Sequence, residues 1–204
     1  MLTLSKYEGK TETEALEKCT TSLDKELEEL YIKKTETETK LFKQKKYIVE
    51  AISKQAIISY IRNYIKEIDK SFNIEIKSDI REQDDIIKVT LISNNNPILI
   101  GISGKNIEAL QILIRNSIRN QIGLNIKVEI DASNYKKKKE EKFIREINEL
   151  IKEVEETKID IKLDPMNSYK RRIVHNLVKE HVNLKTESIG TEPERYTIIK
   201  YKED

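Results

Sequence analysis

The sequence predicts an α+β protein made of three small domains, and three observations lead to this prediction. Segments with hydrophobic residues at helical spacing alternate with short, strand-like segments along the whole chain of 204 residues. Hydrophobic residues make up 37% and charged residues 36% of the chain, which is polar for one globule but normal for several small domains. Helix-start residues at Ser53 and at 131–134 divide the chain into residues 1–52, 53–132 and 133–204.

The composition limits the classes of function. The net charge is only +2, so any nucleic-acid site must depend on a local cluster of basic residues. Cys19 is the single cysteine, which excludes an internal disulfide, fits a reducing cytoplasm and is expected to fill a hydrophobic core. The first residues lack a signal-peptide core, and no apolar run approaches the ~18 residues of a membrane span. With two histidines, no metal-spaced cluster and no nucleophile elbow, the sequence predicts neither an enzyme nor a metal or cofactor site.

The first domain, residues 1–52, has the pattern of a β-α-β-β unit. A short strand over 2–7 precedes a helix over 11–30, and two strands follow over 31–38 and 47–52. The hydrophobic stripe of the helix consists of Ala15, Leu16, Cys19, Leu23, Leu27 and Leu30.

The second domain begins with a helix that Ser53 can cap. Alternation of apolar and polar residues predicts a strand over 72–77, and β-branched residues predict another over 86–92. Asp84 and Asp85 form a turn between them, so the two strands are expected to pair as an antiparallel hairpin.

The rest of the second domain comprises a loop, a helix and a third strand. Residues 94–97 are expected to form the loop, Gly123 to end the helix, and residues 125–130 to form the strand. The helix is recognised by hydrophobic residues at helical spacing, namely Ile107, Leu110, Leu113 or Ile114, and Ile118.

Two glycines three residues apart, Gly101 and Gly104, stand immediately before this helix. Neither carries a Cβ, so the backbone can pass close to another group, and a helix N-terminus beside Lys105 suits a phosphate. A Walker loop is excluded because the glycines are too close and Asn106 stands where the Mg²⁺-binding hydroxyl would be. An ordinary tight turn is the alternative. The candidate binding residues of this turn are Gly101, Ile102, Ser103, Gly104, Lys105 and Asn106.

The third domain is expected to contain a long helix over 135–157, a strand over 159–163, a helix opened by Pro165, and two strands over 186–190 and 196–201. At 100° per residue, the buried side of the second helix is predicted to be Met166, Tyr169, Ile173, Val174, Leu177 and Val178.

Basic residues of the third domain are candidates for a second contact with nucleic acid. Arg171 and His175 are one helical turn apart and are predicted to lie on or beside the face opposite the apolar stripe, which favours binding. Lys170 and Arg172 complete this candidate set. The lysine run 136–139 is either a solvated helix face or a surface that faces phosphate.

The stretches that contain these two candidate sites resemble known domains. Ile98–Gly104 followed by Ile107–Gln111 resembles the loop and following helix of the bacterial-type (type II) KH domain of the Jag family, also called KhpB, EloR or SpoIIIJ-associated protein. KH domains clamp about four nucleotides at a GXXG loop, whose central pair usually includes a basic residue; here the pair is Ile102-Ser103. Leu163–Tyr169 followed by Arg171–His175 resembles the domain named for an Arg and a His separated by three residues, whose members bind single-stranded nucleic acid.

The N-terminal domain resembles that of the Jag family more loosely, through Glu8–Thr11 and Leu41-Phe42. Together the resemblances imply a cytoplasmic, single-stranded RNA-binding protein that regulates genes after transcription in bacteria and is linked to cell elongation and envelope synthesis. They also imply a small KH-domain protein as partner and proximity, through the N-terminal domain, to membrane-associated envelope or insertion machinery, and they leave a homodimer open. The competing interpretation is a protein-interaction scaffold near membrane-protein insertion, with weak or no RNA binding.

Overall fold

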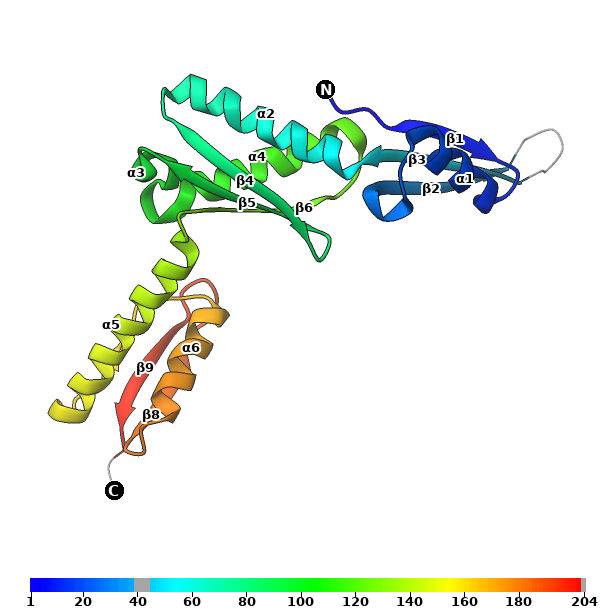
Figure 1. The fold of residues 1–204 in the computed structure, drawn as a ribbon. Coiled ribbons are helices and arrows are strands. Elements are labelled where there is room, and N and C mark those ends of the chain that lie inside the picture. The colour runs from blue at the N-terminus through cyan, green and yellow to red at the C-terminus, as the bar shows by residue number, and fades with distance from the viewer. Residues whose placement is uncertain (39–44, 203–204) are drawn as a thin grey trace. The chain divides into compact units, whose positions relative to one another are not determined.

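A computed structural model describes residues 1–38 and 45–202 (Figure 1). Within these residues the chain has six α-helices and three sheets of three strands each, which confirms the α+β prediction. It divides into two compact units, Met1–Tyr135 and Lys136–Asp204, and the first unit contains two of the three sheets. The three-domain boundaries at 52 and 132 therefore stay a prediction.

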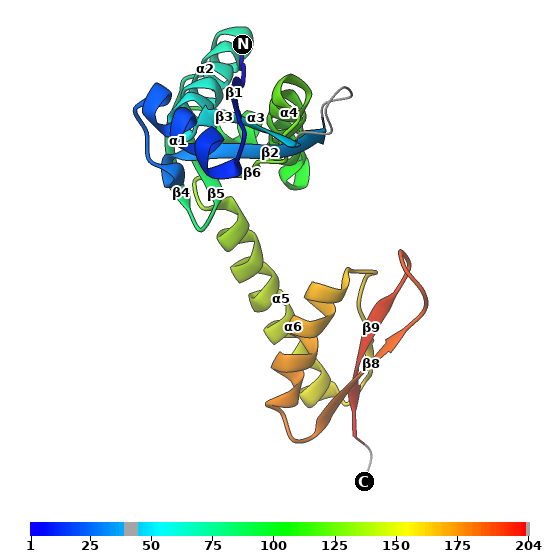
Figure 2. The same ribbon diagram turned by 90° about the vertical axis from the view of Figure 1, so that its right-hand side faces the viewer.

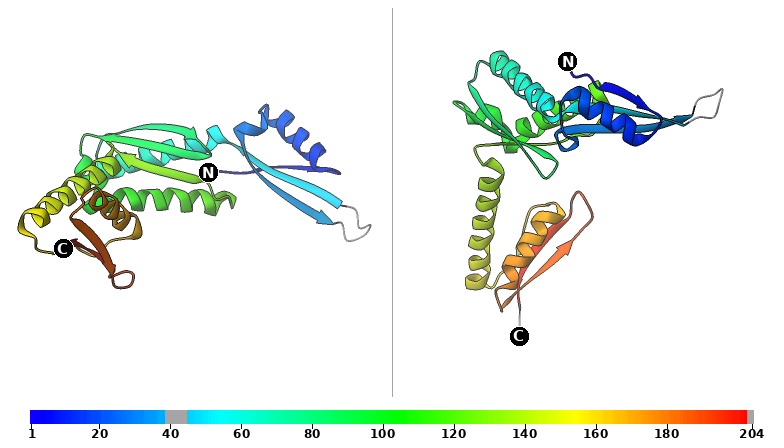
Figure 3. Two further views of the ribbon diagram at one scale, coloured as in Figure 1. Left: turned by 90° about the horizontal axis from the view of Figure 1, so that it is seen from below. Right: turned by 45° about the vertical axis from the view of Figure 1, so that its right-hand side comes forward.

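The first sheet comprises β1 (Ser5–Gly9), β2 (Leu30–Glu38) and β3 (Lys45–Ser53), in the antiparallel order β1-β3-β2. Helix α1 (Glu12–Leu23) follows β1 and lies across one face of the sheet (Figure 3). The sequence predicted that this helix continues to Leu30, which is wrong. Its backbone turns into the left-handed region at Asp24, and a separate 3-10 turn follows at Leu27–Glu29.

The core of the first sheet is small. Cys19 has no exposed surface, so its predicted role as core filler is confirmed, and burial raises the pKa of its thiol. The pair Leu41-Phe42, which carried part of the resemblance, lies outside the described residues. The buried residues are Ala15, Cys19, Leu30, Val49 and Ala51.

The second sheet has the order β4-β5-β6, with β4 (Ile76–Gln83) antiparallel and β6 (Lys127–Ala132) parallel to β5 (Ile86–Ser93). The predicted hairpin is confirmed, and its turn residues Asp84 and Asp85 both have positive φ. Helices α2 (Lys54–Phe72) and α4 (Lys105–Ile122) share the core with the sheet. The helix-strand-strand-helix-strand order expected from the sequence is present, with one additional short helix, α3 (Asn96–Ile100).

Two sequence predictions for this region are wrong in part. The first strand of the hairpin was predicted over 72–77 but runs from Ile76 to Gln83, because α2 continues through Phe72 and ends at Asn73, a residue type that tolerates the left-handed conformation found there. Of the loop predicted over 94–97, Asn94 and Asn95 do form a turn, but Asn96 and Pro97 already belong to α3. Asn95 caps α3, and Pro97 is tolerated in the first turn, where no helical hydrogen bond requires its missing N–H.

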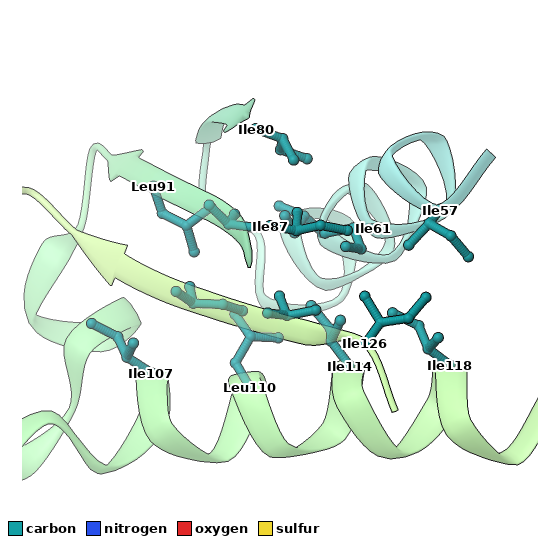
Figure 4. Packing of buried hydrophobic residues seen from close by; sticks show 14 of the residues in the cluster. Ile57, Ile61, Ile80, Ile87, Leu91, Ile107, Leu110, Ile114, Ile118 and Ile126 are labelled. Atoms are coloured by element: carbon teal, nitrogen blue, oxygen red, sulfur yellow. The ribbon is translucent and has the colours of Figure 1, made fainter. Parts of the chain in front are cut away.

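Isoleucine dominates the core beneath α4 (Figure 4). Side chains from α4 meet those of α2 and of the strands, and each residue in this group is at most 9% exposed. Such dense packing gives the turn before α4 a rigid base. The labelled residues of the core are Ile57, Ile61, Ile80, Ile87, Leu91, Ile107, Leu110, Ile114, Ile118 and Ile126.

The N-terminal segment also packs against this core. Leu2 is 6% exposed and belongs to the same hydrophobic cluster, as does Ile52 at the end of β3. The backbone N–H of Leu2 donates a hydrogen bond of 2.7 Å to Oε1 of Gln121 on α4. A truncation that removes Leu2 would therefore take a residue out of the core beneath α4.

In the second unit, α5 (Tyr135–Thr157) and α6 (Ser168–Lys179) cover one face of a sheet of order β7-β9-β8 (Figure 2). The strands are β7 (Ile161–Lys162), β8 (Leu184–Ile189) and β9 (Tyr196–Tyr201). The predicted bounds of α5 and β9 are confirmed. Pro165 does not open α6; Asn167 caps it by accepting a hydrogen bond from the N–H of Lys170.

Candidate nucleic-acid interface

The glycine turn lies between α3 and α4 and has an unusual backbone. Gly101, Ser103 and Gly104 have φ values of 72°, 56° and 89°, all in the region that favours glycine. The N–H of Gly104 donates to the carbonyl of Gly101 at 3.2 Å, which closes the turn. Ile102 at its tip is 84% exposed, so the turn presents the pair Ile102-Ser103 to solvent.

Internal packing already explains both glycines. A Cβ on Gly101 would overlap the side chain of Asn106, and one on Gly104 would lie 2.6 Å from Cε1 of Tyr135. Gly104 is buried. The close approach that the sequence attributed to an outside phosphate is therefore made, at these two Cα atoms, by the chain's own side chains.

The two residues after the turn are both exposed, and one of them, Asn106, also has a structural hydrogen bond. Nδ2 of Asn106 donates a 2.8 Å hydrogen bond to the carbonyl of Ile98, which ties α3 to the start of α4. Lys105 is exposed at the N-terminus of α4, where the helix dipole adds to its positive charge. Lys105 and Ile102 thus present exposed side chains to a ligand at this turn.

An apolar pocket of about 280 Å³ lies beside the turn, between the end of α2, α3 and α4. Phe72 and Leu113, which line it, are 64% and 54% exposed, and Ile98 from α3 is 47% exposed. Sequence reasoning placed Phe72 in a strand and missed its part in this pocket. The available signal was its position one turn after Ile68 in a helical pattern.

Arg171 does not point away from the apolar stripe, so that prediction is wrong. It is 7% exposed, and its Nη1 donates to the carbonyl of Met166 at 2.5 Å and to Oε1 of Glu192 at 2.8 Å. Glu192 lies in the connection between β8 and β9. The guanidinium therefore joins the start of α6 to this connection.

His175 also faces the sheet. Its Nδ1 is hydrogen-bonded to the hydroxyl of Thr186 on β8, and its Nε2 lies 3.0 Å from Oγ of Ser188. Oγ of Ser188 in turn lies 3.1 Å from Oγ1 of the buried Thr197 on β9. Both side chains thus face inward: His175 joins α6 to β8 and, through Ser188, to β9, whereas Arg171 joins α6 to the connection between these strands.

The neighbouring residues lie outward. Arg172 is exposed, and Nζ of Lys170 lies 4.7 Å from the ring centroid of Phe143, a cation–π distance. Tyr169, predicted to be buried, is 58% exposed. The four candidates of α6 therefore separate into two inward residues and two on the outside, whereas Gly101 to Asn106 form one continuous turn in the other unit.

Within the described residues, no group of three or more His, Cys, Asp and Glu side chains could hold a metal ion. None of the helices described has the length and apolar content needed to cross a bilayer.

Comparison with known proteins adds independent information. Residues 142–201 match the family model of the R-3-H domain, the domain named for an Arg and a His separated by three residues. The chain is 27% identical over 159 residues to RNA-binding protein KhpB of Clostridium symbiosum, covering 77% of this chain and 72% of that protein. It is 27% identical over 164 residues to RNA-binding protein KhpB of Bacillus subtilis, covering 79% of each chain. The match to RNA-binding protein KhpB of Streptococcus pneumoniae is 25% over 143 residues, or 70% of this chain and 42% of that one. The C-terminal unit therefore matches the model of the Arg-x-x-x-His domain, and most of the chain is similar to proteins named RNA-binding protein KhpB.

Proposed function

We propose that this protein binds single-stranded RNA and is not an enzyme. The observation that carries the proposal is the exposed Ile102-Ser103 tip at the N-terminus of α4, with Lys105 beside it and an apolar pocket nearby. KH domains bind single strands at such a loop. The names of the relatives, RNA-binding protein KhpB, support the same function.

At the turn, phosphates would bind near Lys105 and the N–H groups of the first turn of α4, where the helix dipole favours negative charge. Ile98 and Ile102 supply apolar surface for bases. Asn106 and both glycines have internal contacts that shape the turn, and the exposed residues Ile102 and Lys105 would supply the main ligand contacts.

In the Arg-x-x-x-His domain, the exposed Arg172 and the outer residue Lys170 would contact phosphate. Arg171 and His175 would position α6 against the sheet and hold this surface in place. Two weak sites on one chain gain affinity through effective concentration when one strand occupies both.

The first prediction is that Ile102→Asp combined with Ser103→Asp lowers the affinity for single-stranded RNA at least tenfold, about 1.4 kcal/mol. Two carboxylates at the tip would repel phosphate, while Ile102 is exposed and aspartate tolerates the positive φ of Ser103. Fluorescence anisotropy with a labelled RNA measures the affinity of the full chain.

The matched control is Ile102→Asn with Ser103→Asn, which has the same shape and backbone tolerance without the charge. It is expected to retain most of the affinity lost by the aspartate pair. Equal affinity of the parent and the aspartate pair would remove the turn from the RNA site.

The second prediction concerns salt. The logarithm of the binding constant should fall linearly with the logarithm of salt concentration, with a slope near −0.7 per phosphate neutralised on a single strand. Arg172→Ala, which removes one contact to phosphate, should make the slope shallower by about 0.7. Lys179→Ala, which changes an exposed cation at the far end of α6, is the control and should leave the slope unchanged. A parent slope near zero would favour the scaffold function.

The finer assignments rest on the family alone. They are a cytoplasmic location in bacteria, regulation after transcription linked to cell elongation and envelope synthesis, and contact with a small KH-domain protein or with membrane-associated insertion machinery. The division into an N-terminal, a KH and an Arg-x-x-x-His domain belongs to the same proposal. Crosslinking in cells, followed by sequencing of the attached RNA, tests whether the bound transcripts encode envelope functions.

A further inference from the structure

Tyr169 is a large aromatic side chain left mostly in solvent, although the helical pattern predicts it to be buried. It stands in the first turn of α6, and 58% of it is exposed. Its hydroxyl donates a 2.8 Å hydrogen bond to Oε1 of Glu140 on α5. The same carboxylate raises the pKa of Tyr169, so the hydroxyl keeps its proton and the bond keeps its direction. The ring is therefore both exposed and fixed in position.

The surroundings of this ring are basic. Glu140 belongs to the first two turns of α5, where residues 136–142 contain five lysines and two glutamates. Beside it, Lys170 lies over the ring of Phe143, and Arg172 follows one turn after Tyr169. The two helices contact each other here within one unit, so the ring and these cations belong to one surface.

A fixed aromatic ring among cations is the arrangement that sequence-tolerant single-strand binding uses. A base stacks on the ring because every base has a π-face, while lysine and arginine follow the backbone. Tyrosine has only two side-chain torsions to fix, and here the bond to Glu140 restricts them before any ligand arrives. Burial in the core does not explain the residue, since the core of this unit is formed from other positions of α6, including Val174 and Val178.

We propose that the ring of Tyr169 is a stacking platform for one base of a single-stranded nucleic acid. The adjacent phosphates would be held by the lysines of α5 and by Arg172. The proposal deepens the RNA-binding function and rests on it. It adds a contact to a base on a surface for which the sequence predicted only contacts between basic side chains and phosphates.

The test compares Tyr169→Ala and Tyr169→Phe in the full chain. With short single-stranded RNA of mixed sequence, Tyr169→Ala should lose about 5- to 150-fold in affinity, the range expected for one stacked base. Tyr169→Phe keeps the ring and loses only the hydroxyl, so it should stay within about threefold of the parent. With an abasic ribose-phosphate strand of the same length, the parent and Tyr169→Ala should bind equally.

A spectroscopic readout separates stacking from a general loss of charge or fold. The chain contains no tryptophan, so Tyr169→Trp introduces a single indole. RNA should quench its fluorescence strongly, whereas the abasic strand should not. The control is Val182→Trp, which places the indole at a residue of the same unit that is 84% exposed and lies after the end of α6.

The outcomes distinguish this inference from the function on which it rests. Parent protein that fails to bind RNA overturns both. Parent binding with the expected salt slope, together with equal affinity of Tyr169→Ala or equal quenching of the two indoles, overturns the platform and leaves the RNA-binding function standing.

Discussion

Arg171→Ala is expected to lower the free energy of unfolding of the C-terminal unit by about 1.5–3 kcal/mol, the usual range for hydrogen bonds to a charged group. The guanidinium is 7% exposed and bonds both the carbonyl of Met166 and the carboxylate of Glu192. Its loss leaves that carbonyl without this donor and frees the connection between β8 and β9. Amide hydrogen exchange in α6, β8 and β9 of the full chain measures the change.

Arg172→Ala is the matched control, because it removes the same charge one position away on the exposed side of α6. The free energy of unfolding that hydrogen exchange reports for Arg172→Ala should lie within about 0.5 kcal/mol of the parent value, as for most surface substitutions. Arg171→Lys should recover little of the stability, since one ammonium cannot reproduce a guanidinium that reaches two acceptors. If Arg171→Ala exchanged like the parent but no longer bound RNA, the guanidinium would be a direct contact and its positioning role would be wrong.

The faces of α6 illustrate why sequence reasoning failed there. A helical wheel places hydrophobic residues inward, and it assumes that charged residues point outward. Arg171 is inward because its partners are Glu192, 21 residues later, and a carbonyl before the helix. Partners that are distant in sequence give no periodic signal, so neither the burial of Arg171 nor the exposure of Tyr169 could be predicted.

Several helix starts and ends could be predicted from the sequence, because they depend on the residues next to them. The caps and ends at Ser53, Gly123 and Tyr135 lie where the sequence predicts, because each depends on residues within a few positions of itself. The end of α2 was misplaced for a related reason. Ile74 and Ile76 suggested alternation, but Asn73 adopts the left-handed conformation that ends the helix, and the strand starts only at Ile76.

For the glycine turn, the sequence located the candidate site but not the reason for its glycines. The position of a G-x-x-G turn at a helix N-terminus can be read from residues 101–107 alone. The neighbour that requires Gly104 to lack a side chain is Tyr135, which is distant in sequence and meets the turn only in the folded chain.

Gly104→Ala is accordingly expected to destabilise the first unit by about 2–5 kcal/mol. The new Cβ would lie 2.6 Å from Cε1 of Tyr135, and alanine would have to adopt a φ of 89°. Left-handed backbone costs about 1–2 kcal/mol for a residue with a Cβ, and overpacking adds about 1–3 kcal/mol. Amide hydrogen exchange in α4 and β6 of the full chain measures the loss. Gly104→Asp would carry the same penalty, so its effect on RNA affinity could not be separated from misfolding.

Gly123→Ala isolates the backbone part of this cost, because Gly123 also has a positive φ, of 70°, but no atom of the described residues lies within 4 Å of the point where its Cβ would stand. Gly123→Ala should lower the free energy of unfolding by about 1–2 kcal/mol. In a Tyr135→Ala background the clash is absent, so Gly104→Ala should then cost no more than Gly123→Ala does. Equal costs of the two glycine substitutions in the parent would mean that Tyr135 does not constrain the turn. The close approach of a phosphate from a ligand would then be the remaining explanation for glycine at position 104.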